Sequence, residues 1–484
     1  MTMHGAEQRH PNIVVIMSDD QGPWALGCAG NTEIQTPHLD ALAAEGTRLS
    51  RFFCASPVCS PARASLLTGQ IPSRHGVHDY LDGAHVGPES VDYLAGQPTF
   101  TAALADAGYR LGLSGKWHLG ASDVPRDGFV HWFALEGGGS PYGRARMHRD
   151  GIPEDIEGYL TDVFADDAID FIDAEARRTE PFFLALNFTA PHKPFAGQHP
   201  REYTDLYRDC AFDSCPQGDP HPWQPTVDGV PIGGEADARE ALIGYFAAVT
   251  AMDAAIGRVL KRLDDLGIGD DTLVVFVSDN GFNCGHHGIW GKGNGTFPQN
   301  MYDESVMVPF IARQRGQITE GAVVDDLLSG YDCAATILEL AGIDPAPFEA
   351  GPGASFAPAL CGEKLLERPV VVHDEYGPVR MIRTRTRKYV HRYPFGPHEF
   401  YNLEADPGET TNRVDQPEHA SEIHELRRQM HAWFSEHADE AIDGAELPVA
   451  GAGQVTAVYP DPLGAFTPPN WDGTGATASQ EVAE

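Results

Sequence analysis

Short apolar runs alternate with amphipathic segments along the first 280 residues of the chain. Apolar runs of this length that end at polar or glycine residues are typical of buried strands. The predicted strands are residues 13–17, 111–114, 182–188 and 272–277, and the predicted helices are residues 37–45, 99–107, 161–174 and 238–266. Strands that are apolar throughout, alternating with helices, predict an α/β fold with a large, mostly parallel sheet that is covered by helices on both faces.

The pattern changes near residue 368. Short alternating segments at residues 370–372, 379–382 and 388–391 predict antiparallel strands, and residues 400–409 form a turn-rich link to a closing helix at residues 420–434. We therefore divide the chain into three parts, which are a large α/β domain at residues 1–367, a smaller C-terminal α+β subdomain at residues 368–440, and an irregular tail at residues 441–484 that is rich in Gly, Ala and Pro.

Charge and composition exclude some partners. The chain has 34 Lys and Arg against 70 Asp and Glu, a formal charge of −36, which argues against nucleic acid as a ligand. An anionic substrate would need cations concentrated locally to overcome this field. Residues 1–11 lack an apolar signal segment, and the run at residues 13–17 is too short to span a membrane. We therefore expect a cytoplasmic protein without a membrane partner. The eight cysteines do not form a disulfide framework; Cys210 and Cys215 could pair or bind a metal, but free thiols are expected there.

Polar residues follow the predicted strands directly. Asp19-Asp20 follows the first strand and Asp279-Asn280 follows the strand at residues 272–277. In parallel sheets, ligands bind beyond the carboxyl ends of the strands, so the two pairs are placed for a common site. Three carboxylates and an amide are hard oxygen ligands that suit Ca²⁺ or Mg²⁺. Each pair alone would be a weak signal, because such dipeptides commonly form turns or helix caps.

Three basic residues follow other strands. Lys116 and His118 come after the strand at residues 111–114, and an extended segment would point both side chains the same way. His192 follows the strand at residues 182–188. Taken alone, Lys116 and His118 would more commonly be a surface lysine beside a packed histidine.

A further helix is predicted to begin at Cys59, because Pro61 suits the first turn of a helix. Arg63 follows one turn later, and an exposed helix N-terminus beside an arginine would bind an anion. The segment Cys59-Ser60-Pro61-Ala62-Arg63, closed by Thr68-Gly69, resembles the signature of the type I sulfatases, which have an alkaline-phosphatase-like fold. Ala62 departs from the serine that many members have there. The resemblance implies that a formylglycine-generating enzyme oxidises Cys59 to formylglycine (3-oxoalanine), whose hydrated aldehyde attacks a sulfate ester.

The resemblance covers about residues 11–410 and assigns roles to further positions. Its remaining motifs are Gly115–Gly120, Ala190–Phe195, Gly288–Lys292, Met301–Ser305, Val308–Phe310 and Asp406–Glu409. It implies a metal site formed by Asp19, Asp20, Cys59, Asp279 and Asn280, which would hold Ca²⁺, with Mg²⁺ as the alternative.

The resemblance also implies catalytic roles. Arg63 and Lys116 would bind sulfate oxygens, and His118 would take the proton that lets sulfate leave the enzyme. His192 would be a second sulfate-binding histidine, and Lys292 would contact the bridging oxygen.

The expected activity is hydrolysis of a sulfate monoester, either of a carbohydrate or of a small alkyl or aryl alcohol. The expected partners are a sulfated small molecule or oligosaccharide and the maturation enzyme, and a homo-oligomer is left open. A phosphonate or phosphate ester hydrolase is the alternative, because the same fold and formylglycine serve those esters. A non-catalytic sulfoglycan-binding protein is less favoured, because it should have lost Cys59 or a metal carboxylate. The loop residues Trp117, Trp223, Trp290 and His199 could line the rim of the site or serve as packing anchors.

Overall fold

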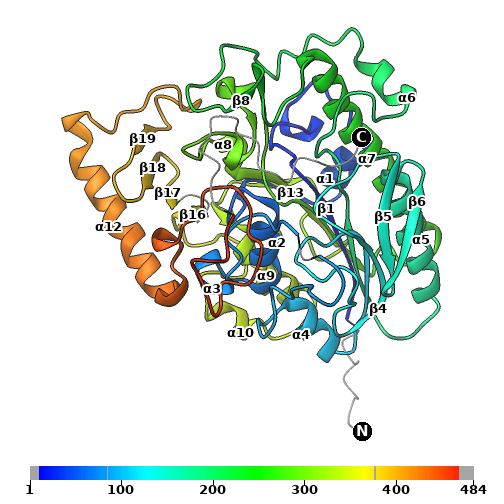
Figure 1. Ribbon diagram of the computed structural model, residues 1–484. Helices are drawn as coiled ribbons and strands as arrows, with labels where there is room; N and C mark the ends of the chain where they lie inside the picture. Colours follow the sequence, from blue (N-terminus) through cyan, green and yellow to red (C-terminus); the bar gives the residue numbers. More distant parts are fainter. Residues whose placement is uncertain (1–9, 84, 375–377, 468–484) are drawn as a thin grey trace.

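The structure is a computed structural model that describes residues 10–83, 85–374 and 378–467 (Figure 1). A large sheet forms the centre of the molecule. Its strands in spatial order are β14 (Ala322–Val324), β2 (Thr47–Phe53), β13 (Met307–Arg313), β10 (Thr272–Ser278), β1 (Asn12–Ser18), β7 (Phe182–Asn187), β3 (Arg110–Lys116), β4 (Phe129–Leu135), β5 (Arg144–Arg149) and β6 (Ile152–Glu157), with β15 (Leu328–Ser329) beside β2.

The middle of this sheet is parallel. β10, β1, β7, β3 and β4 all run in the same direction, whereas β13 and β5 are antiparallel to their inner neighbours. The predicted α/β fold with a mostly parallel central sheet flanked by helices is therefore confirmed. The register pairs Ser18 of β1 with Ser278 of β10, so these two strands end side by side.

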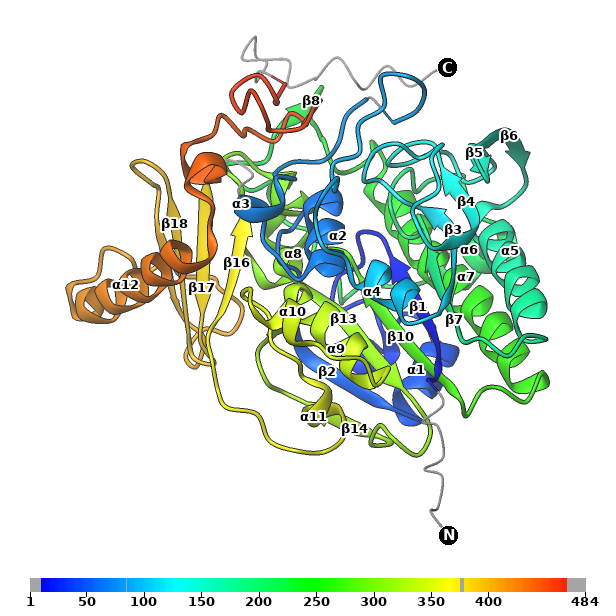
Figure 2. The same ribbon diagram turned by 90° about the horizontal axis from the view of Figure 1, so that it is seen from below.

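Two helical layers cover the sheet, and the residues of β1 alternate between them. Ile13, Val15 and Met17 belong to one buried cluster, whereas Val14 and Ile16 belong to another. This alternation follows from the twofold repeat of a strand. The first cluster contains the helices α2 (Cys59–Thr68), α4 (Phe100–Asp106) and α9 (Cys333–Leu340), and the second contains α1 (Pro37–Ala44), α5 (Leu160–Glu175) and α7 (Ala238–Asp265) (Figures 1 and 2).

α7 is apolar and long enough to cross a membrane, but 89% of its most apolar window is buried inside the protein. Its N-cap is Asp237, whose carboxylate accepts the backbone N–H groups of Arg239 and Glu240. The apolar face packs on the sheet through residues such as Met252, Ile256 and Val259. α7 is therefore a core helix.

The C-terminal part contains a separate antiparallel sheet beside the large one (Figure 2). Its strands are β16 (Val370–Asp374), β17 (Val379–Arg383), β18 (Arg387–Arg392) and β19 (Glu399–Asn402). α12 (Ala420–His437) buries Leu426, Met430 and Phe434, which are four residues apart and so lie on one helical face. These side chains belong to the same cluster as the first helical layer of the large sheet. β19 falls in the segment that we predicted to be a turn-rich link.

Shorter elements complete the described chain. They are the helices α3 (Pro72–His75), α6 (Arg201–Thr204), α8 (Asp303–Val306), α10 (Ala346–Glu349) and α11 (Ala357–Leu360), and the strand pairs β8 (Thr226–Val227) with β9 (Val230–Pro231) and β11 (Asn283–Cys284) with β12 (Trp290–Gly291). After α12 the chain forms short 3₁₀ turns and isolated β-bridges at Gln454 up to residue 467, and Gln454 and Ala465 are fully buried. Residues 1–9 and residues 468–484, the latter part of the predicted tail, lie outside the described residues.

Candidate active site

The site begins where β1 and β10 end. Because Ser18 pairs with Ser278, the following residues Asp19 and Asp279 are neighbours at the carboxyl edge of the sheet. Asp20 adopts a left-handed backbone with φ 63°, and its N–H donates to Asp279 Oδ1 at 3.2 Å. Asn280 Nδ2 donates to Asp20 Oδ1 at 2.8 Å. The two acidic pairs predicted from separate strands thus form a single cluster.

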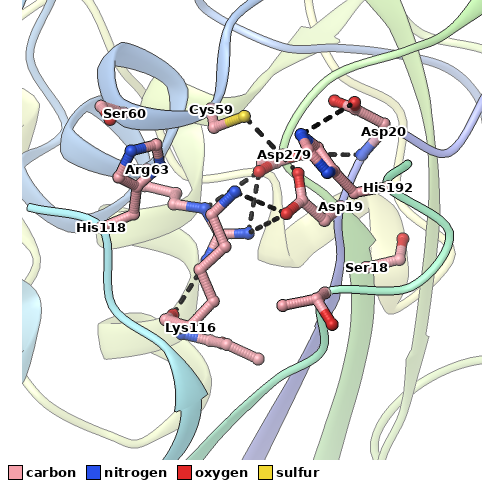
Figure 3. Close-up of polar contacts among 12 residues, drawn as sticks. Ser18, Asp19, Asp20, Cys59, Ser60, Arg63, Lys116, His118, His192 and Asp279 are labelled. Carbon is pink, nitrogen blue, oxygen red and sulfur yellow. Dashed lines mark hydrogen bonds and ion pairs between the residues drawn. The ribbon is translucent and has the colours of Figure 1, made fainter. Parts of the chain in front are cut away.

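Cys59 brings the N-terminus of α2 to this cluster (Figure 3). Its Sγ lies 3.5 Å from Asp19 Oδ1, and ligand atoms of Cys59, Asp19 and Asp279 all lie within 4.8 Å of one another. The expectation of an exposed helix end is wrong, because Cys59 is 3% exposed and Arg63 is 2% exposed. Burial raises the pKa of the Cys59 thiol to about 12. The thiol is therefore protonated at neutral pH and is a poor nucleophile as it stands.

Three cationic side chains surround the carboxylates. Arg63 Nε and Nη2 lie 2.9 and 2.8 Å from Asp279 Oδ2, and Lys116 Nζ lies 2.5 Å from Asp19 Oδ2. These cations balance the buried carboxylates despite the acidity of the whole chain.

Lys292 is the third cation. Its Nζ lies 2.6 Å from Asp20 Oδ1 and 2.8 Å from Cys59 Sγ. Burial would lower the pKa of Lys292, but Asp20 and Cys59 raise it well above its usual range. The glycine-rich loop that contains Lys292 therefore reaches the predicted site.

The donor set fits a divalent cation. Burial and the charge of Asp279 raise the pKa of Asp19 to about 7, whereas Lys292 and His192 overcome the effect of burial and lower the pKa of Asp20 to about 2. Asn280 Oδ1 is buried and accepts no hydrogen bond from any residue that the structure describes. An unpartnered buried oxygen beside crowded carboxylates is the arrangement that a hard cation satisfies.

His118 lies on another side of the site. The prediction that it points the same way as Lys116 from an extended segment is not supported, because β3 ends at Lys116 and His118 has a left-handed φ of 56°. His118 Nε2 lies 3.2 Å from the carbonyl oxygen of Leu81. Its Nδ1 is buried without a hydrogen-bond partner in the described part of the chain. Burial, together with the charge of Lys116, lowers the pKa of His118 well below its usual range.

His192 is close to the acidic cluster. Its Nε2 lies 3.8 Å from Asp20 Oδ2, and its Nδ1 lies 2.7 Å from the carbonyl oxygen of Lys193. Because a carbonyl oxygen can only accept, Nδ1 holds the proton and Nε2 has the free lone pair. Burial lowers the pKa of His192 to about 3, so the ring is neutral.

Two glycines of the run at residues 137–139 lie against these histidines. A β-carbon at Gly138 would stand 2.4 Å from His118 Nε2, and one at Gly139 would stand 3.3 Å from His192 Cε1. Neither this loop nor Leu81 was among the residues predicted for the site. The run of three glycines was the available signal, since glycine permits close backbone approach.

Of the residues proposed for the rim, most are packing residues. Trp117 and Trp290 are buried in hydrophobic clusters, and His199 is buried beside the hydroxyl group of Tyr159 at 2.9 Å. Trp223 is half-buried, and the guanidinium group of Arg392 lies 4.9 Å from its ring centroid. Trp223 is therefore the one residue of the four that keeps a partly exposed indole.

Comparisons with known proteins identify relatives of the chain. A family model described as Sulfatase matches residues 11–343, and one described as N-sulphoglucosamine sulphohydrolase, C-terminal, matches residues 285–436. An ulvan-active sulfatase of Formosa agariphila is 32% identical over 451 residues, which cover 90% of this chain and 83% of that protein.

Solved structures share the fold. One, in complex with its substrate D-glucosamine-2-N,6-O-disulfate, has a TM-score of 0.77 and 25% identity, covering 90% of this chain and 100% of that chain. The phosphonate monoester hydrolase of Agrobacterium radiobacter has a TM-score of 0.70 and 21% identity, covering 89% and 96% of the two chains. At that identity the second likeness concerns the fold alone.

Proposed function

The chain belongs to the sulfatase family, and from this premise we propose that it hydrolyses the sulfate monoester of a carbohydrate at the site around Cys59. The observation that carries the proposal is the buried convergence of Cys59 with Asp19 and Asp279, surrounded by cationic side chains. Such a pocket concentrates positive charge around the position of a tetrahedral anion, although the chain as a whole is acidic.

The carbohydrate substrate class has support from the relatives. A neighbouring structure holds a sulfated glucosamine, and residues 285–436 match a family model described as N-sulphoglucosamine sulphohydrolase, C-terminal. We therefore favour a sulfated sugar or oligosaccharide over a small alkyl or aryl sulfate.

A divalent cation would be held by oxygen atoms of Asp19, Asp20, Asp279 and Asn280, next to residue 59. The donors are hard oxygens, so Ca²⁺ is proposed, with Mg²⁺ as the alternative. Bound there, the cation supplies positive charge that stabilises the sulfate oxygens in the transition state.

Matured to formylglycine, residue 59 would supply the nucleophile as the hydroxyl group of a hydrated aldehyde. Asp279, with a carboxylate oxygen within 4.8 Å of Cys59 Sγ, is proposed to accept the hydroxyl proton. Arg63 and Lys116, whose cationic groups lie against Asp279 and Asp19, are proposed to bind sulfate oxygens.

The other basic residues are proposed to assist the departure of the alcohol and the later departure of sulfate. Lys292 and His192 flank Asp20 and are proposed to support the leaving alcohol oxygen. His118 keeps a buried lone pair on Nδ1 and is proposed to take the second hydroxyl proton, which lets sulfate leave.

The proposal is tested by mass spectrometry and activity on one preparation. The peptide spanning residue 59 should lose about 18 Da when cysteine becomes the aldehyde. Cys59→Ala should abolish sulfate release, whereas Cys333→Ala, which changes another buried cysteine at a helix start, should keep most of the activity. Retained turnover in Cys59→Ala would refute the assignment of the nucleophile.

The alternative is a phosphonate or phosphate ester hydrolase. The matured enzyme should therefore be assayed in parallel on glucosamine 6-sulfate, an aryl sulfate and an aryl phosphonate. We expect the sugar sulfate to have the highest kcat/KM. A higher kcat/KM for the phosphonate would replace the proposed activity with the alternative, and a higher value for the aryl sulfate would reject the carbohydrate class.

A further inference from the structure

The segment 76–82 links the C-terminal tail to the proposed active site. On one side, Leu81 N donates to Ser60 Oγ at 3.2 Å, and Ser60 is the residue after Cys59. The carbonyl oxygen of Leu81 is also the partner of His118 Nε2 at 3.2 Å. The position of this short segment therefore determines what the His118 ring contacts.

Gln454 of the tail holds the same segment from the other side. The residue is fully buried, although the tail around it has little regular structure. Its side chain donates from Nε2 to the carbonyl oxygen of Gly76 at 3.0 Å and accepts the N–H of His78 at 2.9 Å. Its backbone N–H donates to Tyr80 O at 2.8 Å, and its carbonyl accepts Asp82 N at 2.9 Å.

A second tail contact strengthens this attachment. Gly453 N donates to Asp79 Oδ2 at 3.0 Å, and Leu81 forms a parallel bridge with Gln454. Within the described chain, residues 453 and 454 thus bind backbone or side-chain groups along most of the segment 76–82. A chain segment fixed by so many buried hydrogen bonds has few alternative positions.

The contact with Leu81 determines the tautomer of His118. A carbonyl oxygen can only accept, so Nε2 must hold the proton and Nδ1 must have the lone pair. A base works only with its lone pair aimed at the proton it removes, and a displacement of about 1 Å can cost about a hundredfold in rate. If Leu81 moved, the ring could rotate or change tautomer, and Nδ1 would no longer be the basic atom.

We propose that Gln454 is a positioning residue for the reaction, acting through Leu81 to hold His118 with Nδ1 as the base. The inference rests on the proposed role of His118 in the release of sulfate. It gives the C-terminal tail a function in the second half of the reaction, after the alcohol has left. The tail is therefore part of the catalytic unit.

Different kinetic constants report on the two halves of the reaction, which are the departure of the alcohol and the release of sulfate. The value of kcat/KM includes steps only up to the departure of the alcohol, whereas kcat also includes the release of sulfate. Loss of a residue that serves only the second half should lower kcat and KM together. A general loss of structure would instead lower kcat/KM or the fraction of active enzyme.

The experiment compares four variants of the matured full-length enzyme. Gln454→Leu keeps the side-chain size and removes the side-chain hydrogen bonds, and Gln454→Glu is a milder second variant that keeps an acceptor for His78 N. Val458→Ala loosens the packing of the same tail, because Val458 is buried there but contributes no hydrogen bond to the segment 76–82 among the described contacts. His118→Ala reports the full loss of the base.

Steady-state constants and the first turnover of the alcohol should be measured with an aryl sulfate. We expect Gln454→Leu to lower kcat about tenfold, to keep kcat/KM within about twofold, and to show a burst of alcohol release. Gln454→Glu should show the same pattern more weakly. Hydrogen exchange of the peptide that spans residues 76–82 should become faster in Gln454→Leu. Val458→Ala should keep the kcat of the wild type.

The outcomes distinguish a failure of the positioning role of Gln454 from a failure of the role proposed for His118. If His118→Ala shows the burst and Gln454→Leu behaves like the wild type, the inference is wrong and the role of His118 stands. If Gln454→Leu lowers kcat/KM as much as kcat, or Val458→Ala lowers kcat equally, the tail has only a structural role. If His118→Ala itself lowers kcat/KM without a burst, the role proposed for His118 fails, and the inference fails with it.

Discussion

Gly138 lies against the ring of His118, so closely that a β-carbon at residue 138 would stand 2.4 Å from Nε2 and 2.5 Å from Cε1. Real β-carbons do not approach heavy atoms at this distance, so any side chain would displace the ring or the loop. The same nitrogen contacts the carbonyl oxygen of Leu81 at 3.2 Å. The absence of a side chain at residue 138 therefore helps to determine where the proposed base lies.

Replacing this glycine should impair catalysis. We expect Gly138→Ala to lower kcat about a hundredfold, because the displaced imidazole loses its alignment. Gly137→Ala is the matched control, since its β-carbon would meet only His85 Cδ2 at 3.9 Å, an ordinary contact. Steady-state assays on both variants, with thermal unfolding to verify the fold, make the comparison. Equal activity of the two variants would contradict the placement of His118 in the site.

The buried state of His118 predicts a pH dependence of stability. Burial and Lys116 hold the pKa of His118 well below its usual range, so the folded protein keeps the ring neutral where an unfolded histidine, with a pKa of about 6.5, takes up a proton. The contribution of this group to stability is therefore fully present above pH 6.5 or so and declines as the pH falls below it.

Chemical unfolding at pH 7.5 and at pH 5 tests whether the contribution of His118 to stability falls with pH. The wild type should lose more unfolding free energy between the two values than His118→Asn, which cannot take up the proton. A larger loss in His118→Asn would show that His118 is already protonated in the fold. For the same reason, kcat should show no decline centred near pH 6.5 that arises from His118.

Metal binding should depend on the unpartnered oxygen of Asn280. Calcium at a hundred times its Kd should raise the unfolding free energy by about 2.7 kcal/mol, because it binds only the folded chain. Asn280→Ala should reduce this increment and weaken the affinity measured by titration calorimetry. EDTA should abolish activity in the wild type.

Asn283 provides the control for this experiment. Its buried Nδ2 donates to Gly291 O and Ser305 Oγ at 3.0 and 2.7 Å, and its described hydrogen bonds do not reach the carboxylates. Asn283→Ala should therefore lower stability equally with and without calcium. An undiminished calcium increment in Asn280→Ala would exclude Asn280 from the metal site.

A buried ion pair joins the C-terminal subdomain to the large domain. Lys388 of β18 is fully buried, and its Nζ binds Asp303 Oδ1 at 2.7 Å and the carboxylate of Glu409. Lys388→Met should cost about 3–5 kcal/mol, because it leaves the buried carboxylate of Glu409 without its counter-charge and leaves Asp303 paired with Arg383 alone. Urea unfolding measures this loss.

The exposed pair Lys261–Asp265, at 2.6 Å, is the comparison. Lys261→Met should change stability by less than about 1 kcal/mol, because water screens the exposed pair. Adding Glu409→Gln to Lys388→Met should recover part of the loss. A cost below about 1 kcal/mol for Lys388→Met would mean that the pair contributes little to holding the subdomain.

Several elements could not be predicted from the sequence. β6 (Ile152–Glu157) is an exposed edge strand without an apolar run, and β13 contains Pro309 within a register shift between Val308 and Phe310. Such strands form because a neighbouring strand is available for pairing. The turn at His118 was also not predicted, because no local feature of the sequence indicates its left-handed backbone.

By itself, the sequence determined the parallel sheet, the residues at its carboxyl edge and the family, because apolar periodicity and the Cys59 motif are local properties of the chain. The tertiary structure alone decided that Arg63 is buried against Asp279, that Gly138 approaches His118, and that Gln454 holds the segment next to Cys59. These contacts join residues far apart along the chain. Their distances are set by how the layers and the tail pack around the sheet, which no local pattern of side chains encodes.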